Sequence, residues 1–154
     1  MTIYFYSADA EPYGVFSNFS SHGIEVAGVY YKTSEHYYQS MKFAGSPQDM
    51  EDVRRASTPK MAASVGRDRK RPLRPDWEEV KDDIMRRGVL RKFETHASLR
   101  ELLLSTGDEE IVENAPKDYY WGCGSDGTGK NMLGKILMET RAILRERAAD
   151  DSGG

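Results

Sequence analysis

The sequence has little of what several classes of protein require. Its 154 residues include one cysteine, Cys123, so no intramolecular disulfide can form. The three histidines, His22, His36 and His96, share no metal-ligand spacing with one another or with Cys123. We therefore expect no metal and no redox cofactor. The N-terminus also lacks the basic and apolar segments of a signal peptide, so we expect a reducing, cytoplasmic location.

Long apolar segments and an excess of basic charge are also missing. No apolar run approaches the ~20 residues that span a bilayer, so a membrane partner is not expected. With 22 basic and 25 acidic residues, the formal net charge of −3 gives no overall basic field for nucleic acid. Neither an internal repeat nor a long linker is present. We predict one domain over residues 1–147 and a disordered tail over residues 148–154.

What is present predicts a mainly α-helical fold with a small N-terminal β element. Aromatic and β-branched runs at residues 3–6 and 24–31 favour short strands. Thr58 before Pro59 is typical of a helix start, and Asp76 before Trp77 begins a long amphipathic pattern. A shorter helix is predicted over residues 99–105, and an apolar stripe predicts a last helix over residues 133–144. Residues 67–75 form a proline-bounded loop.

Residues 33–43 are the most informative segment. As a helix, they place Glu35, Gln39 and Lys42 on one face, with Tyr38 and Met41 nearby. An acid, an amide and a cation beside aromatic rings could line a polar ligand site. The alternative is an ordinary solvated face.

The glycine-rich segment 122–131 leads into the last predicted helix. Its glycine-to-lysine spacing up to Gly129 and Lys130 is similar to that of a phosphate-binding loop, but Asn131 replaces the metal-binding Ser or Thr. A nucleotide triphosphatase is therefore not expected. Backbone N–H groups at a helix start can still bind an anion, and a tight turn with a helix cap is the alternative. Cys123 has no histidine nearby in sequence to act as its base.

A basic run precedes the long amphipathic helix. It consists of five cations, which are Arg67, Arg69, Lys70, Arg71 and Arg74. Such a run is either a solvated loop or a clamp for phosphate. The two tryptophans, Trp77 and Trp121, would ordinarily be counted as core, although Trp121 lies just before the glycine-rich loop, where its ring could stack on a planar ligand.

Several sequence blocks, taken in order, carry a family resemblance. They are residues 16–19 (Phe-Ser-Asn-Phe), 33–43, 73–77 (Leu-Arg-Pro-Asp-Trp), 121–124 (Trp-Gly-Cys-Gly) and 131–138. With these blocks the chain resembles the YbiA-like family, also called NADAR, from about residue 3 to residue 145. The resemblance implies a mainly α-helical domain that hydrolyses N-glycosidic bonds of ribose. It implies two substrate classes: ribosylamino-pyrimidine phosphates of riboflavin biosynthesis, and ADP-ribose attached to guanine.

The resemblance also implies residue roles. The catalytic glutamate would be Glu35, the ligand-contacting tryptophan Trp77, and the Asp-x-x-Trp-Gly block would supply Asp118 and Trp121. The chain departs from the family in its polar residues 31–33 before Glu35 and in extra cations at residues 69–71.

These roles lead to a predicted mechanism. Glu35 would stabilise an oxocarbenium-like ribose and activate water, and Asp118 or Lys42 would protonate the departing base. The phosphate would bind the cationic loop and residues 127–130. The predicted substrate-binding residues are Asn18, Phe19, Lys42, Arg67, Arg69, Lys70, Trp77, Trp121, Gly129, Lys130 and Asn131.

The rival interpretation is a non-catalytic module that binds ADP-ribose or NAD. In the catalytic interpretation, the partner is a small-molecule substrate or an ADP-ribosylated nucleic acid. The latter would link the protein to a toxin that ADP-ribosylates guanine.

Overall fold

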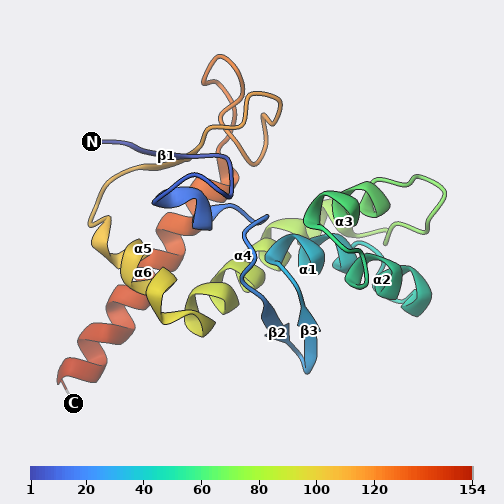
Figure 1. Ribbon diagram of the computed structural model, residues 1–154, viewed down its shortest axis with the longest axis horizontal. Coiled ribbons are helices and arrows are strands. Elements are labelled where there is room, and N and C mark those ends of the chain that lie inside the picture. Colours follow the sequence, from blue (N-terminus) through green and yellow to red (C-terminus); the bar gives the residue numbers. More distant parts are fainter. Residues whose placement is uncertain (154) are drawn as a thin grey trace. The chain divides into compact units, whose positions relative to one another are not determined.

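The structure, a computed structural model, describes residues 1–153 and divides the chain into two compact units (Figure 1). Unit 1 contains Met1–Ser17 and the chain from Phe93 onward, and unit 2 contains Asn18–Lys92. The sequence contains no linker that indicates this division. Helices dominate both units and the strands are three residues long, which confirms the predicted mainly α-helical class.

Unit 2 begins with a β-hairpin. Strand β2 (Ile24–Val26) pairs antiparallel with β3 (Val29–Tyr31). The two turn residues, Ala27 and Gly28, have positive φ angles of 52° and 82°, as a two-residue hairpin turn of type I′ requires. The structure thus confirms strands within residues 24–31.

Three short helices follow the hairpin: α1 (Ser34–Met41), α2 (Pro47–Arg54) and α3 (Pro59–Gly66). They pack against one another in unit 2 (Figure 1). Thr33 caps α1 by accepting a hydrogen bond from the His36 N–H, and Thr58 caps α3 by accepting one from Met61. The helix starts at residues 33 and 58 are therefore confirmed. A buried apolar cluster fills this part of the unit and contains Phe43, Val53, Ala56 and Ala62.

Helix α4 (Trp77–Thr95) confirms the predicted long helix, and its residues 77–92 belong to unit 2. In this unit Ile84 packs against the apolar cluster formed by the hairpin and Tyr37. Helix α4 therefore packs against the hairpin and Tyr37 through this cluster.

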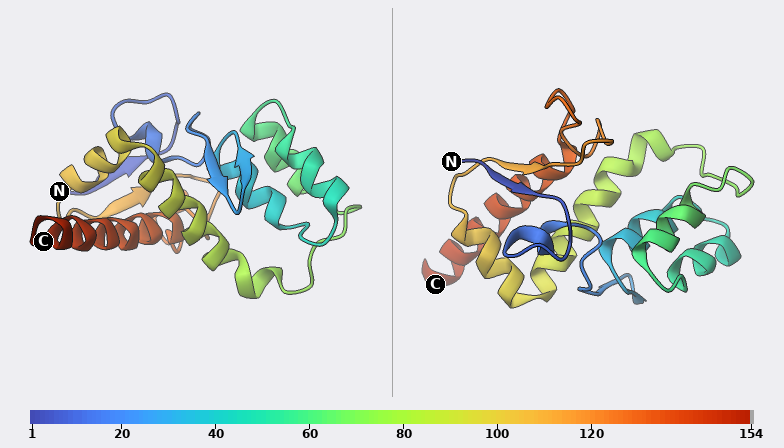
Figure 2. Two further views of the ribbon diagram at one scale, coloured as in Figure 1. Left: turned by 90° about the horizontal axis from the view of Figure 1, so that it is seen from below. Right: turned by 45° about the horizontal axis from the view of Figure 1, so that its top comes forward.

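Unit 1 contains a parallel pair of strands and two helices. Strand β1 (Ile3–Phe5) pairs with β4 (Ile111–Glu113), and α5 (Ala97–Ser105) packs against α6 (Met132–Gly153) (Figure 2). A 3₁₀ turn, η1 (Tyr13–Phe16), brings the Phe16 ring to 6.0 Å from Phe5 and 5.8 Å from Phe93, measured between ring centroids. Sequence reasoning missed β4, because three residues give almost no local strand signal.

The last helix is longer than predicted. Residues 148–153 belong to α6, where the sequence predicted a disordered tail, and residue 154 lies outside the described residues. Ala148 and Ala149 are strong helix formers and prolong the preceding turns. Among residues 1–153, no helix is long and apolar enough to cross a membrane.

Candidate functional site

The first turn of α1 positions Glu35. Its backbone N–H donates to the Asn18 carbonyl over 3.2 Å, and the Ser34 hydroxyl donates to Asn18 Oδ1 over 2.9 Å. The Asn18 amide nitrogen also contacts Met85 Sδ at 3.3 Å. Asn18, which we predicted to bind the substrate, therefore already fixes the start of α1. Phe19, beside it, remains 39% exposed.

Glu35, Gln39 and Lys42 lie on one face of α1, as the helical spacing predicts. Gln39 Nε2 donates to Glu35 Oε2 over 2.7 Å, and Lys42 Nζ donates to the Gly66 carbonyl over 3.3 Å. Glu35 is 8% exposed and Gln39 is 4% exposed. The alternative of an ordinary solvated face is therefore wrong, since a solvated face would leave these groups in water.

Lys42 lies in a mixed aromatic and charged environment. Its Nζ is 5.9 Å from the ring centroids of both Tyr38 and Trp77. Burial lowers the pKa of the Lys42 ammonium, and the negative charge of Glu35 acts in the opposite direction. Arg67 contributes a further lowering by like-charge repulsion. Lys42 is thus a cation whose proton is held less firmly than that of an exposed lysine.

Trp77 packs its ring against Tyr38, with 5.1 Å between ring centroids, and it is 6% exposed. It also lines a cavity of about 360 Å³ in unit 2. The other residues of this lining are Lys42, Phe43, Gly66, Arg67, Asp68, Arg69, Arg71 and Leu73. Trp77 is therefore a wall of a cationic cavity rather than a freely exposed stacking surface.

The basic run 67–74 divides into two kinds of cation. Arg71 forms ion pairs with Asp49 at 2.9 Å and Asp52 at 2.7 Å, and Arg74 pairs with Asp76 at 2.7 Å. By contrast, within the described chain no carboxylate pairs with the exposed side chains of Arg67, Arg69 and Lys70. Within the run 67–74, these three cations therefore keep their charge available for a ligand.

The remaining predicted site residues belong to unit 1. Asp118 Oδ1 accepts hydrogen bonds from the backbone N–H groups of Tyr120 at 3.0 Å and Trp121 at 2.8 Å. The carboxylate therefore shapes the turn that carries Trp121. The Trp121 ring is partly exposed and meets Tyr120 edge-on, with 4.9 Å between ring centroids.

The glycine-rich segment does not present the anion-binding amides that we expected. The backbone N–H groups from Gly129 to Leu133 donate to carbonyls of residues 119–123 over 2.7–3.0 Å. Asn131, with a φ of 52°, joins the segment to β4: its Oδ1 accepts from Glu113 N–H and its Nδ2 donates to the Ile111 carbonyl. The alternative of a tight turn fits these contacts, because the amides already have partners.

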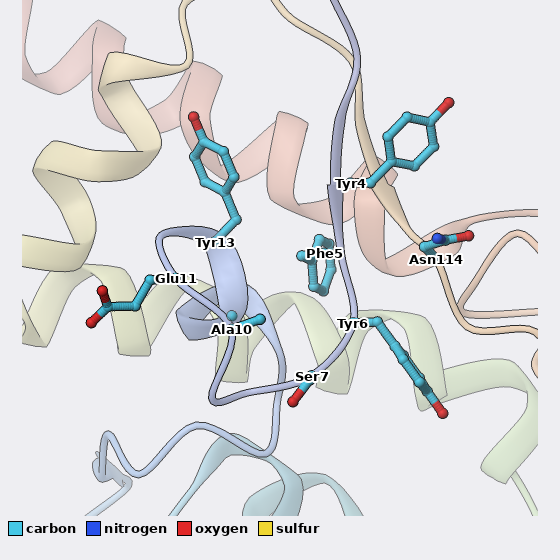
Figure 3. Close-up of a pocket in the computed structure, with 9 residues that line it drawn as sticks. Tyr4, Phe5, Tyr6, Ser7, Ala10, Glu11, Tyr13 and Asn114 are labelled. Carbon is cyan, nitrogen blue, oxygen red and sulfur yellow. The ribbon is translucent and has the colours of Figure 1, made fainter.

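Two further cavities lie in unit 1. One, of about 390 Å³, is lined in part by Cys123, Gly129, Lys130 and Asn131, and Lys130 Nζ lies 5.4 Å from the Tyr120 ring centroid. The other, of about 290 Å³, contains no predicted site residue (Figure 3). Figure 3 shows Tyr4 and Tyr6 pointing away from each other along the strand, with Asn114 between them.

Metal ligands do not gather anywhere in residues 1–153: no group of three His, Cys, Asp or Glu side chains could hold an ion. His36 is fully buried, with Nδ1 at 2.8 Å from Thr33 Oγ1 and Nε2 at 2.9 Å from the Ala56 carbonyl. Burial lowers the pKa of this imidazole. His36 therefore joins α1 to the end of α2 as a structural group.

The structure divides the predicted site residues between the two units. Unit 2 brings together Glu35, Lys42, Trp77, Arg67 and Arg69, whereas the predicted residues 118–131 belong to unit 1. Sequence reasoning missed Gly66, which meets both Gln39 and Lys42. The only available signal was a glycine at the end of a predicted helix.

Comparisons with known proteins identify the family. Residues 4–145 match the NADAR domain. An N-glycosidase of Nostoc punctiforme is 53% identical over 147 residues, which cover 94% of each chain. N-glycosidase YbiA of Escherichia coli is 50% identical over 92% of this chain and 88% of its own.

Structure and a more distant relative agree with this result. The NMR structure of the E. coli protein YbiA superimposes with a TM-score of 0.87 and 47% identity, covering 97% of this chain and 89% of YbiA. A riboflavin biosynthesis protein of Vibrio vulnificus is 41% identical over 95% of this chain, which spans only 39% of that protein. The match over nearly the whole length means that this chain belongs to the NADAR domain family.

Proposed function

We propose that the chain is an N-glycosidase that hydrolyses the bond between C1′ of a phosphorylated ribose and a nitrogen of its base. The observation that carries the proposal is the cluster on α1, where a buried carboxylate, Glu35, lies near a half-buried ammonium, Lys42, beside a cationic cavity. The N-glycosidase names of two relatives, at 53% and 50% identity, support it.

The two charges suit the two halves of the reaction. As the C1′–N bond breaks, its electron pair stays on the base nitrogen, and positive charge grows on the ribose, where Glu35 stabilises it. Water then forms the C1′–O bond and gives a proton to Glu35. The Lys42 ammonium supplies the proton that the departing nitrogen takes up. Its lowered pKa makes it a better donor than an exposed lysine.

Lys42 is a better candidate for the proton donor than Asp118. The Asp118 oxygen that accepts two backbone N–H groups is engaged in holding a turn. A carboxylate in that role acts as an acceptor, whereas the departing base needs a donor. Lys42 has three N–H groups and lies over the Trp77 ring at the cavity wall.

The cations of the cavity indicate the substrate class. Arg67 and Arg69 line the cavity and Lys70 follows them, so a phosphate ester is the natural ligand. We favour a ribosylamino-pyrimidine phosphate, because a relative at 41% identity is named a riboflavin biosynthesis protein. ADP-ribosylated guanine is the second candidate, since three cations without ion pairs offer more charge than one phosphate needs.

The test offers both substrates to the purified protein and follows release of the base by chromatography. Glu35→Gln keeps the shape of the side chain and removes its charge. We expect it to lower turnover by a factor on the order of 10²–10⁴ while the ligand still binds. Binding without release by the wild type would support the non-catalytic alternative. A Glu35→Gln variant that keeps more than about a third of the turnover would refute the role of Glu35.

A further inference from the structure

We infer that Gln39 is a positioning residue for Glu35. We infer also that Gly66, which has no side chain, leaves the space that the Gln39 amide occupies. The inference rests on the proposed N-glycosidase function. Gln39 follows Glu35 by one helical turn, and its Nε2 donates to Glu35 Oε2 over 2.7 Å. A buried hydrogen bond to a charged group is stronger than one in water, so it fixes the rotation of the carboxylate.

The other end of the Gln39 amide is unusual. Gln39 Oε1 is buried and has no hydrogen-bond partner. Leaving a buried acceptor unpaired costs roughly 1–3 kcal/mol, so stability alone does not explain a glutamine at this position. Turning the amide over would place Oε1 against the Glu35 carboxylate, where two acceptors repel. The orientation that donates to Glu35 is therefore retained although it leaves Oε1 unpaired.

Gly66 explains why the amide cannot move away. A Cβ atom added at Gly66 would lie 2.0 Å from Gln39 Oε1 and 2.7 Å from Cδ, so the α3 backbone lies directly against the amide. The Gly66 carbonyl also accepts from Lys42 Nζ at 3.3 Å. Gly66, at the end of α3, thus contacts both Gln39, which positions Glu35, and Lys42, the proposed proton donor.

The charges around the cluster allow this role to be isolated. Three charged side chains act on Lys42: Glu35, Arg67 after the end of α3, and Lys81 on α4. Gln39 itself is neutral, so replacing it changes none of them. Gln39→Met keeps the length of the side chain and removes only the donor and the unpaired acceptor.

A matched control exists on the surface. Gln48 donates from Nε2 to Asp52 Oδ1 over 2.8 Å, with the same four-residue spacing, on an exposed face of α2. Gln48→Met removes the same kind of bond away from Glu35. It controls for any general effect of losing a glutamine–carboxylate pair.

We expect Gln39→Met to lower kcat by a factor on the order of 10–100, because small displacements of a reacting group have effects of this size. The acidic limb of its pH–rate profile should move to higher pH, since Glu35 loses a donor that favours its charged form. Gln48→Met should match the wild type in both. In a Glu35→Gln background, Gln39→Met should cause no further loss, because the group that it positions is gone.

Gly66→Ala tests the same inference without removing the donor. Alanine suits a helical position, so a loss of kcat here reports the methyl group pressing on Gln39. Two results would overturn this inference and leave the proposed function intact. One is an unchanged kcat and pH–rate profile in Gln39→Met; the other is an equal loss of kcat from Gln39→Met in the wild-type and Glu35→Gln backgrounds. No release of base by the wild type would overturn the proposed function together with it.

Discussion

Lys92 should make the stability of the protein depend on pH in the alkaline range. The side chain lies on α4, is 1% exposed, and burial lowers its pKa from 10.5 to about 7. Between these values the unfolded chain holds a proton that the folded chain lacks. Unfolding therefore takes up a proton in this range, and raising the pH makes that uptake less favourable, so stability should rise between about pH 7 and pH 10.

The slope follows from the proton difference. One extra proton in the unfolded state gives about 1.4 kcal/mol of stability per pH unit, or several kcal/mol over the whole window. Below the folded pKa both states are protonated, and the contribution of this group no longer changes. Lys92→Met removes the titration and keeps most of the side-chain volume, so its stability should lack this rise.

Urea unfolding at about pH 7, 8 and 9, followed by circular dichroism, measures the effect. The quantity to compare is the difference in unfolding free energy between wild type and Lys92→Met at each pH, which cancels the other titrating groups. Lys60→Met, at an exposed position on α3, serves as the control and should run parallel to the wild type. Parallel curves for wild type and Lys92→Met would refute the reasoning.

Three further predictions concern the site. Replacing Arg67, Arg69 and Lys70 together with alanine should weaken ADP-ribose binding, as should added salt in the wild type; equal affinity in low-salt calorimetry would leave these residues as a solvated loop. Asn131→Ala should destabilise the fold by about 2 kcal/mol in urea, because its two backbone partners lose their bonds. The turnover of the folded Asn131→Ala variant should stay within about twofold of wild type, and a larger loss would indicate that Asn131 contacts the ligand. EDTA should leave base release unchanged. A loss of base release in EDTA that added zinc or magnesium restores would refute the metal-free mechanism.

The sequence by itself determined those features whose physical cause is local. Thr58 before Pro59 identifies a helix start, because its side-chain oxygen accepts a hydrogen bond from the amide three residues later. Glu35, Gln39 and Lys42 could be placed on one face from the helical period alone. The family also follows from residue blocks that keep their order along the chain.

Only the tertiary structure decided which groups have partners. Arg71 and Arg67 are both arginines of one loop, yet Arg71 meets Asp49 and Asp52 some twenty residues away, and Arg67 meets no carboxylate in the described residues. The sequence likewise predicts an anion site at residues 127–130, but in the fold the amides of Gly129 and Lys130 donate to the carbonyls of Cys123 and Tyr119. Gly66 and Gln39 are adjacent only because α3 packs on α1. Hydrogen bonds and ion pairs act over a few ångströms of space, whatever the distance along the chain, and for this reason the folded structure alone assigns them.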